Sequence, residues 1–185
     1  IDKFNKTKGD EMFKKMKKIV LFVFITLLAT SAVAKGEKGY VGSKACEVCH
    51  QKLYKEYKKT LHSQMIKDVK KNPRAIVGDF ESKSDIRTFE KKDVLYTIGN
   101  KWKQRYITKK GDELYILPAQ YNIATGEWKP YHASNWQERP WLQKCGQCHT
   151  TGLDYEKREF TEPGVGCESC HGAGENHVNS PKPGD

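Results

Sequence analysis

Six cysteines occur in the chain, and all six fall in pairs of the form Cys-x-x-Cys-His. The three copies are CEVCH at 46–50, CGQCH at 145–149 and CESCH at 167–171. This pattern is the attachment signal of c-type haem: two thiols form thioethers with the porphyrin vinyl groups, and the adjacent histidine supplies an axial nitrogen to the iron. We therefore expect three haem c groups, with thioethers at Cys46, Cys49, Cys145, Cys148, Cys167 and Cys170 and proximal ligands at His50, His149 and His171.

Two other uses of paired cysteines compete with haem attachment. Two Cys-x-x-Cys pairs can form a tetrahedral zinc site, but three pairs do not divide evenly into four-ligand sites. Redox-active disulfides also use this spacing, usually as a single motif at the start of a helix. Neither alternative explains a histidine directly after every pair, so the pattern favours haem.

The three remaining histidines are candidates for the second axial position of each iron. They are His62, His132 and His177, so the chain holds one spare histidine per motif. Bis-histidine ligation closes an iron to small molecules and gives a low reduction potential. Met65 is an alternative ligand near His62, and a methionine there would raise the reduction potential of that haem.

Chain geometry indicates which haem some of these histidines serve. The segment between His50 and His62 has helical periodicity, and a helix of that length rises about 18 Å. Two ligands of one iron lie much closer together, so we expect His62 to serve a different haem from His50. The loop from His171 to His177 is short for wrapping around a porphyrin, so we also expect His177 to cross to a neighbouring haem.

Helices are expected around the motifs, with a region of strands between them. Ser43 is a suitable N-cap for a helix that runs to about Val69, before Pro73. Residues 78–131 are rich in β-branched and aromatic residues, with turn signals at 109–112 and 124–127, and predict two or three β-hairpins. Their aromatic side chains are as well suited to a porphyrin face as to a small core of their own.

The second and third motifs are expected to lie close together. Only seventeen residues separate His149 from Cys167, so their haems should be neighbours. Trp136 and Trp141 precede the second motif, and we expect them to pack on a haem edge, although they would also suit the core.

The N-terminal segment is typical of a secretory signal. Residues 12–34 contain a lysine cluster, an eleven-residue apolar run and an Ala-x-Ala cleavage site. The run is shorter than the ~20 residues of a membrane span, so we expect no stable span after cleavage. Residues 1–11 precede the first methionine and are interpreted as untranslated read-through. Residues 35–178 are then the exported three-haem domain, in the periplasm or at the cell surface, and residues 179–185 a linker or truncated end.

The positive charge of the chain does not by itself indicate a nucleic-acid partner. Residues 1–34 hold seven lysines and three acidic residues, so they carry +4 of the formal +10 and leave +6 for the rest. Three haems bring about six propionate charges, which the basic residues can balance. Export also argues against nucleic acid, and we expect no such partner.

The ordered motifs resemble the cytochrome c-554 family of multihaem c-type cytochromes. The resemblance rests on "YVGSKACEVCH", "TLHSQM", "CGQCHTTGLDY" and "GVGCESCHGAGENHV", and it covers most of residues 40–178. It implies a mainly α-helical, haem-packed fold with extended haem-wrapping segments and a β-hairpin insert at 78–131. It also implies haems in close pairs, and distal ligation by His62 and His177. Family members commonly carry a fourth motif, which the sequence does not contain.

Electron transfer is the function that these observations favour. Closely packed haems with saturated irons can relay electrons without a substrate pocket, and the partners would be redox proteins, such as other multihaem cytochromes or copies of this chain. The rival is an enzyme that reduces or oxidises small nitrogen or sulfur compounds at a five-coordinate haem, which requires that His132 is not a ligand. A third alternative is a polymeric cytochrome in which a histidine ligates a haem of the next subunit.

Overall fold

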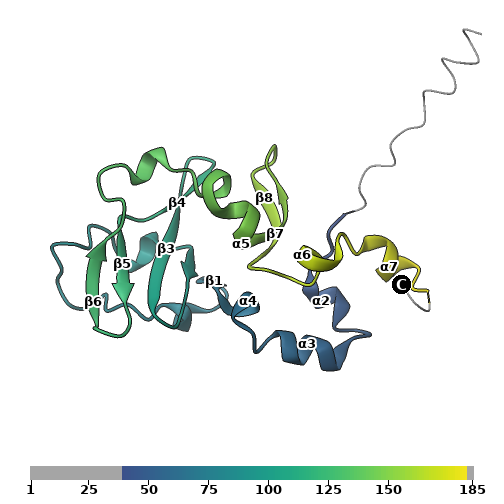
Figure 1. Cartoon of the computed structure of the whole chain (residues 1–185). Helices are drawn as coiled ribbons and strands as arrows, with labels where there is room; N and C mark the ends of the chain where they lie inside the picture. Colours follow the sequence, from purple (N-terminus) through teal and green to yellow (C-terminus); the bar gives the residue numbers. More distant parts are fainter. Residues whose placement is uncertain (1–38, 183–185) are drawn as a thin grey trace, which may run out of the picture. The chain divides into compact units, whose positions relative to one another are not determined.

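The computed structural model describes residues 39–182 (Figure 1). The proposed read-through at 1–11 and signal at 12–34 therefore lie outside the described residues, as do residues 183–185 of the expected linker. No helix within residues 39–182 combines the length and the apolar character needed to cross a membrane.

The larger part of the fold is an antiparallel sheet of six strands. Its order is β1-β2-β3-β5-β6, and β4 pairs with β3 beside β5. The long strand β3 pairs with β2 along one edge, while successive parts of its other edge pair with β5 and β4. The strands are β1 (Ile66–Asp68), β2 (Tyr96–Ile98), β3 (Lys103–Lys110), β4 (Glu113–Ile116), β5 (Ala119–Asn122) and β6 (Glu127–Pro130).

Both turn signals of the sequence join paired strands. Lys110 pairs with Glu113 across the β3–β4 turn, and Asn122 pairs with Glu127 across the β5–β6 turn. Gly111 and Gly126 have φ values of 58° and 69°, in the left-handed region that glycine adopts without a steric penalty. The hairpins thus form where local backbone chemistry favours them.

Each face of this sheet packs against its own apolar cluster. Tyr106 and Ile107 are neighbours on β3 and both fully buried, and they belong to different clusters because successive strand residues point to opposite faces. One cluster contains Phe89, Tyr106, Leu117, Ala119 and Trp128, and the other contains Ile66, Ile107, Leu114, Trp141 and Leu142. Tyr106 and Trp128, two of the aromatic residues at 78–131, therefore belong to a core that the sheet itself provides.

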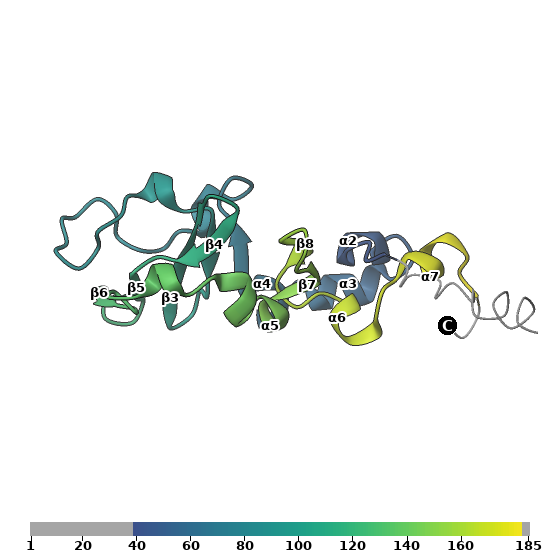
Figure 2. The ribbon, with the colours of Figure 1, turned by 90° about the horizontal axis from the view of Figure 1, so that it is seen from above.

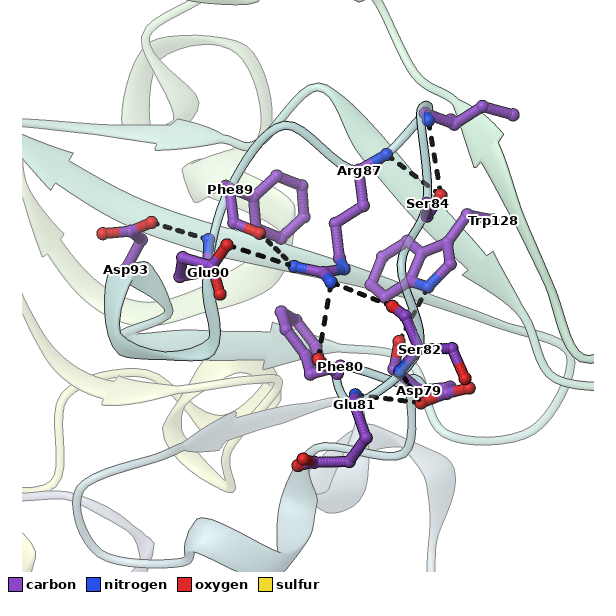
Figure 3. A network of polar contacts seen from close by, with 11 residues as sticks. Asp79, Phe80, Glu81, Ser82, Ser84, Arg87, Phe89, Glu90, Asp93 and Trp128 are labelled. Atoms are coloured by element: carbon purple, nitrogen blue, oxygen red, sulfur yellow. Dashed lines mark hydrogen bonds and ion pairs between the residues drawn. The ribbon is translucent and has the colours of Figure 1, made fainter.

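Residues 79–93 form an irregular loop that is held by a buried arginine (Figure 3). The Arg87 guanidinium donates to the carbonyl oxygens of Phe89, Ser82 and Phe80 at 2.6, 3.2 and 3.4 Å. It also lies 5.0 Å from the ring centre of Phe80 and 5.7 Å from that of Trp128. The loop carbonyls and aromatic faces thus compensate a cation whose side chain is only 7 % exposed.

The helical segments are short, and a two-stranded sheet lies between the second and third motifs. The helices are α2 (Ser43–Cys46), α3 (Gln51–Tyr57), α4 (Leu61–Gln64), α5 (Gln147–His149), α6 (Glu168–His171) and α7 (Glu175–Asn179). The 3-10 turns are η1 (Pro73–Ala75), η2 (Lys91–Asp93) and η3 (Trp136–Glu138), and η4 (Leu142–Gly146) is a π-helix. The small sheet pairs β7 (Thr150–Asp154) with β8 (Glu159–Pro163).

The expectation of a mainly α-helical fold is wrong. Antiparallel strands dominate the described residues, and the continuous helix expected from Ser43 to about Val69 is broken into three pieces followed by a strand. The Thr60 hydroxyl accepts from the Ser63 backbone N–H and begins α4, so α3 and α4 are separate helices. Beyond α4, Ile66 is buried in the sheet and pairs with Ile98, so tertiary pairing overrides local helical periodicity.

Candidate functional site

Each Cys-x-x-Cys-His motif lies on a helical turn. Cys46 ends α2 and His50 is the N-cap of α3, while Cys145 lies in η4 and Cys148 in α5. Cys167 is the N-cap of α6. Residues three apart on a helix share a face, so the two thiols of each motif point to the same side. All six cysteines are free thiols, and the second of each pair is exposed.

The first and third motifs lie directly against each other. The Cys167 backbone N–H donates to the Ser43 hydroxyl at 2.8 Å, which places the start of α6 beside α2. Burial raises the pKa of the Cys46 thiol, and the neighbouring Cys167 thiol raises it further through its charge and a hydrogen bond. Figures 1 and 2 both show α2, α3 and α6 close together. The third motif therefore lies beside the first, far away in sequence, and it also contacts the segment after the second motif, since the hydroxyls of Thr151 and Ser169 are 2.6 Å apart.

A buried glutamate inside the third motif holds this arrangement. The Glu168 side chain accepts from the backbone N–H groups of Val41, Gly42 and Gly174 at 3.0, 2.7 and 2.7 Å. The residue is only 3 % exposed. It thus ties the segment before the first motif to the loop before His177. Sequence reasoning missed this role because the variable positions of Cys-x-x-Cys-His carry no signal for long-range contacts.

His50 and His177 are brought together by these contacts. Their ring centres are 6.1 Å apart and their planes differ by 21°. Two imidazoles on opposite sides of one iron have ring centres about 6 Å apart. Helix α7, which carries His177, also lines an open cavity of about 660 Å³. The structure thus brings two histidines from distant parts of the chain close to each other.

The second motif borders a separate hollow that also contains His132. The hollow is lined by Ile116, Tyr131, His132, Trp136, Arg139, Trp141, Lys144 and Cys145. His132 has a φ of 49°, and its ring packs against Tyr131 with centres 4.5 Å apart. The structure thus brings His132 and Trp136 to the second motif, together with Trp141, the N-cap of the π-helix that contains Cys145.

Burial and nearby arginines act on the titratable groups of the second motif. Burial raises the pKa of the Cys145 thiol, and the charges of Arg139 and Arg105 oppose that rise. Burial lowers the pKa of His149, and the charge of Arg105 lowers it further. The side chains of the second motif therefore lie in a positive electrostatic environment.

His62 lies beside the segment that joins the second and third motifs. Its carbonyl accepts from the Val165 N–H at 3.4 Å, and Gly164 donates to the His149 carbonyl at 2.9 Å. The His62 side chain is exposed. Met65 instead packs against the cluster that contains Ile66 and Ile107, so its side chain contributes to the core.

Side chains around the predicted ligands fit a large apolar group such as haem. Exposed aliphatic residues stand beside several of them: Val48 within the first motif, Leu61 before His62 and Val178 after His177, with 77 %, 52 % and 43 % of their surfaces exposed. Near the second motif, Trp141 Nε1 and His149 Nδ1 are buried without a hydrogen-bond partner. Buried donors usually have partners, so the Trp141 indole is suited to a neighbouring group that carries acceptor atoms. Among residues 39–182, no three side chains of His, Cys, Asp or Glu converge as a site for a bare metal ion.

Each pair of free cysteines lies on a helical turn and is followed by a histidine. Exposed apolar side chains or unpartnered polar ones lie near these motifs. Together these features define a multihaem c-type cytochrome. Residues 45–96 and 118–172 match the family described as cytochrome c554 and c-prime. These segments make up more than half of the chain, which therefore belongs to that family. Membership implies covalently bound haem c, with its iron.

Two solved structures are similar to the chain. One is the outer cell wall cytochrome OcwA, with 33 % sequence identity, a TM-score of 0.69 and coverage of 77 % of this chain and 33 % of that one. The other is the undecaheme cytochrome from the S-layer of Carboxydothermus ferrireducens, with 26 % identity, a TM-score of 0.58 and coverage of 86 % and 24 %. The chain therefore spans about a third and about a quarter of these cytochromes. No curated protein matches the sequence.

Proposed function

We propose that the chain is an electron relay with three haem c groups. The thioethers form at Cys46 and Cys49, at Cys145 and Cys148, and at Cys167 and Cys170, and the proximal ligands are His50, His149 and His171. The free thiols and their placement on helical turns support this assignment. When bound, haem supplies an iron that accepts and donates one electron at a time. The chain's own residues ligate the iron, orient the porphyrin and exclude water.

The pairing of His50 with His177 carries the proposal, because its 6.1 Å separation suits bis-histidine ligation. His177 is then the distal ligand of the first motif's haem, which agrees with the expectation that it crosses to a neighbouring haem. His132 is assigned to the second motif, because His132 and Cys145 line the same hollow. His62 is the remaining candidate, and we assign it to the third motif because its carbonyl contacts Val165, shortly before Cys167.

Electrons would pass most readily between the first and third motifs. Contacts of Cys46 with Cys167 and of Ser43 with the Cys167 backbone support a close pair there. The β7–β8 hairpin connects the second motif to this pair.

The relay is proposed to work outside the cytoplasm, at the cell surface. The two similar structures are an outer cell wall cytochrome and an S-layer cytochrome, which supports this location over the periplasm. The partners would be other multihaem cytochromes, or the remaining haems of a longer protein of which this segment is a part.

Mass spectrometry and spectroscopy of the exported protein test the relay. We expect a mass that exceeds the polypeptide by three haems, and an all-low-spin ferric spectrum that cyanide does not change. His177→Ala should make one haem high-spin while all three stay attached, and that haem should be the one bound at Cys46 and Cys49. Loss of low-spin character at the haem of Cys167 and Cys170 alone would refute the assignment. A high-spin haem in the unmodified protein would favour the enzyme instead.

A further inference from the structure

Three cationic side chains gather around the hollow of the second motif. Arg139 and Lys144 line it together with Cys145. The Arg105 guanidinium lies 4.2 Å from the ring centre of Tyr131, which lines the same hollow. Within the described part of the chain, none of these three cations forms an ion pair with a carboxylate. Their positive charge is thus available to an anionic group in the hollow.

A buried indole in the same hollow also points to a ligand with acceptor atoms. Trp141 is only 1 % exposed, yet its Nε1 has no hydrogen-bond partner. A buried N–H without a partner costs roughly 1–3 kcal/mol. An anionic oxygen bound beside Trp141 and these cations would give the indole N–H an acceptor.

The first and third motifs have the opposite electrostatic environment. The Glu168 side chain is buried between them, and Glu162 accepts from the Ser43 backbone at 3.1 Å. Lys44, which precedes the first motif on α2, pairs with Glu47 inside that motif. The carboxylates of Glu168 and Glu162 thus lie directly against the first and third motifs, where the lysines of α3 are exposed to solvent, whereas cations without a carboxylate partner among the described residues line the hollow of the second motif.

We propose that Arg105, Arg139 and Lys144 form an anion-binding cluster that holds the propionates of the second motif's haem and makes this haem the easiest of the three to reduce. Adding an electron adds negative charge, which nearby cations stabilise and nearby carboxylates destabilise. With haem bound, the cluster would draw an electron from the first or third motif to the second, one haem being oxidised from Fe(II) to Fe(III) as the other is reduced from Fe(III) to Fe(II). This inference rests on the proposed relay.

A redox titration that follows each haem separately by paramagnetic NMR tests the cluster. We expect the second motif's haem to have the highest reduction potential, and the double variant Arg139→Gln/Lys144→Gln to shift it to a more negative value. The other two haems should move less, because they lie beside other motifs. Lys92→Gln is the matched control, since Lys92 is an exposed lysine on η2, away from the hollow.

The outcomes distinguish failure of the proposed anion-binding cluster from failure of the proposed electron relay. A mass that shows three haems supports the relay whatever the potentials are. The cluster would be overturned if the double variant did not shift the potential of the second haem. It would also be overturned if that haem had the lowest potential in the unmodified protein. If the double variant fails to retain haem, Arg105→Gln is the milder variant, because Arg105 reaches the hollow through Tyr131. Its potential shift should have the same sign, and no shift would again overturn the cluster.

Discussion

The six-stranded sheet and the region around the first and third motifs are stabilised in different ways. The sheet buries Tyr106, Ile107 and Ala119 completely, in two apolar clusters that the chain provides itself. In contrast, α3 and α7 contain no buried residue, and the buried residues of α2 and α6 are the polar Ser43 and Glu168. Burial of apolar surface is the main stabilising contribution to folding. The sheet can therefore fold on its own core, whereas the motif region relies on backbone-to-carboxylate hydrogen bonds and on haem.

The largest effect is expected in the core of the sheet. Trp128→Ala should lower the free energy of unfolding by about 3–5 kcal/mol, because it removes a large side chain that packs against Phe80, Phe89 and Tyr106. Chemical denaturation followed by circular dichroism measures this loss. Trp102→Ala is the control, since Trp102 is 63 % exposed and should change stability by less than about 1 kcal/mol. Equal losses of unfolding free energy in the two variants would show that Trp128 contributes no more to stability than an exposed tryptophan does.

Hydrogen exchange of the haem-free polypeptide compares the two regions directly. We expect amides of β3 and β5 to exchange at least about 100-fold more slowly than those of α3 and α7, because local opening needs less free energy where few apolar contacts are broken. Cytoplasmic expression without haem attachment supplies the sample. Similar protection in both regions would show that the motif region is stable without haem, and would contradict the comparison.

Glu168→Gln should weaken the motif region by about 2 kcal/mol and leave the sheet unchanged. The substitution keeps the shape of the side chain but replaces one acceptor oxygen by a donor, so at least one of the N–H groups of Val41, Gly42 and Gly174 loses its charged partner. Exchange rates of these amides, measured with those of β3, report the effect by region. Glu156→Gln is the matched control, because Glu156 is exposed. Unchanged exchange at all three of these amides would show that the carboxylate does not hold the segment.

Local chemistry explains which features could be predicted from the sequence. The Cys-x-x-Cys-His motifs and the turns at Gly111 and Gly126 depend on neighbouring residues, so spacing and residue type were enough to identify them. The helix expected to about Val69 was wrong because Ile66 is taken into the sheet by Ile98, a residue far along the chain. The contact of His50 with His177 and the role of Glu168 also depend on long-range packing, which single-sequence patterns do not encode.

The smallest expected effect is the response of the motif region to alkaline pH. Burial raises the pKa of Tyr57 to about 12, from an ordinary value near 10. As pH rises from 10 towards 12, the unfolded chain loses the Tyr57 proton first, so stability falls through this window. Because the side chain is only partly buried, solvent screening limits the contribution to about 1 kcal/mol.

Tyr57→Phe should remove this pH-dependent contribution. The unfolding free energy of the variant should therefore decline less steeply above pH 10 than that of the unmodified protein, with equal slopes below pH 10. Burial also raises the pKa of Tyr106 in the sheet, so both proteins should keep a residual decline. Identical slopes above pH 10 would mean that the environment of Tyr57 does not disfavour its ionisation.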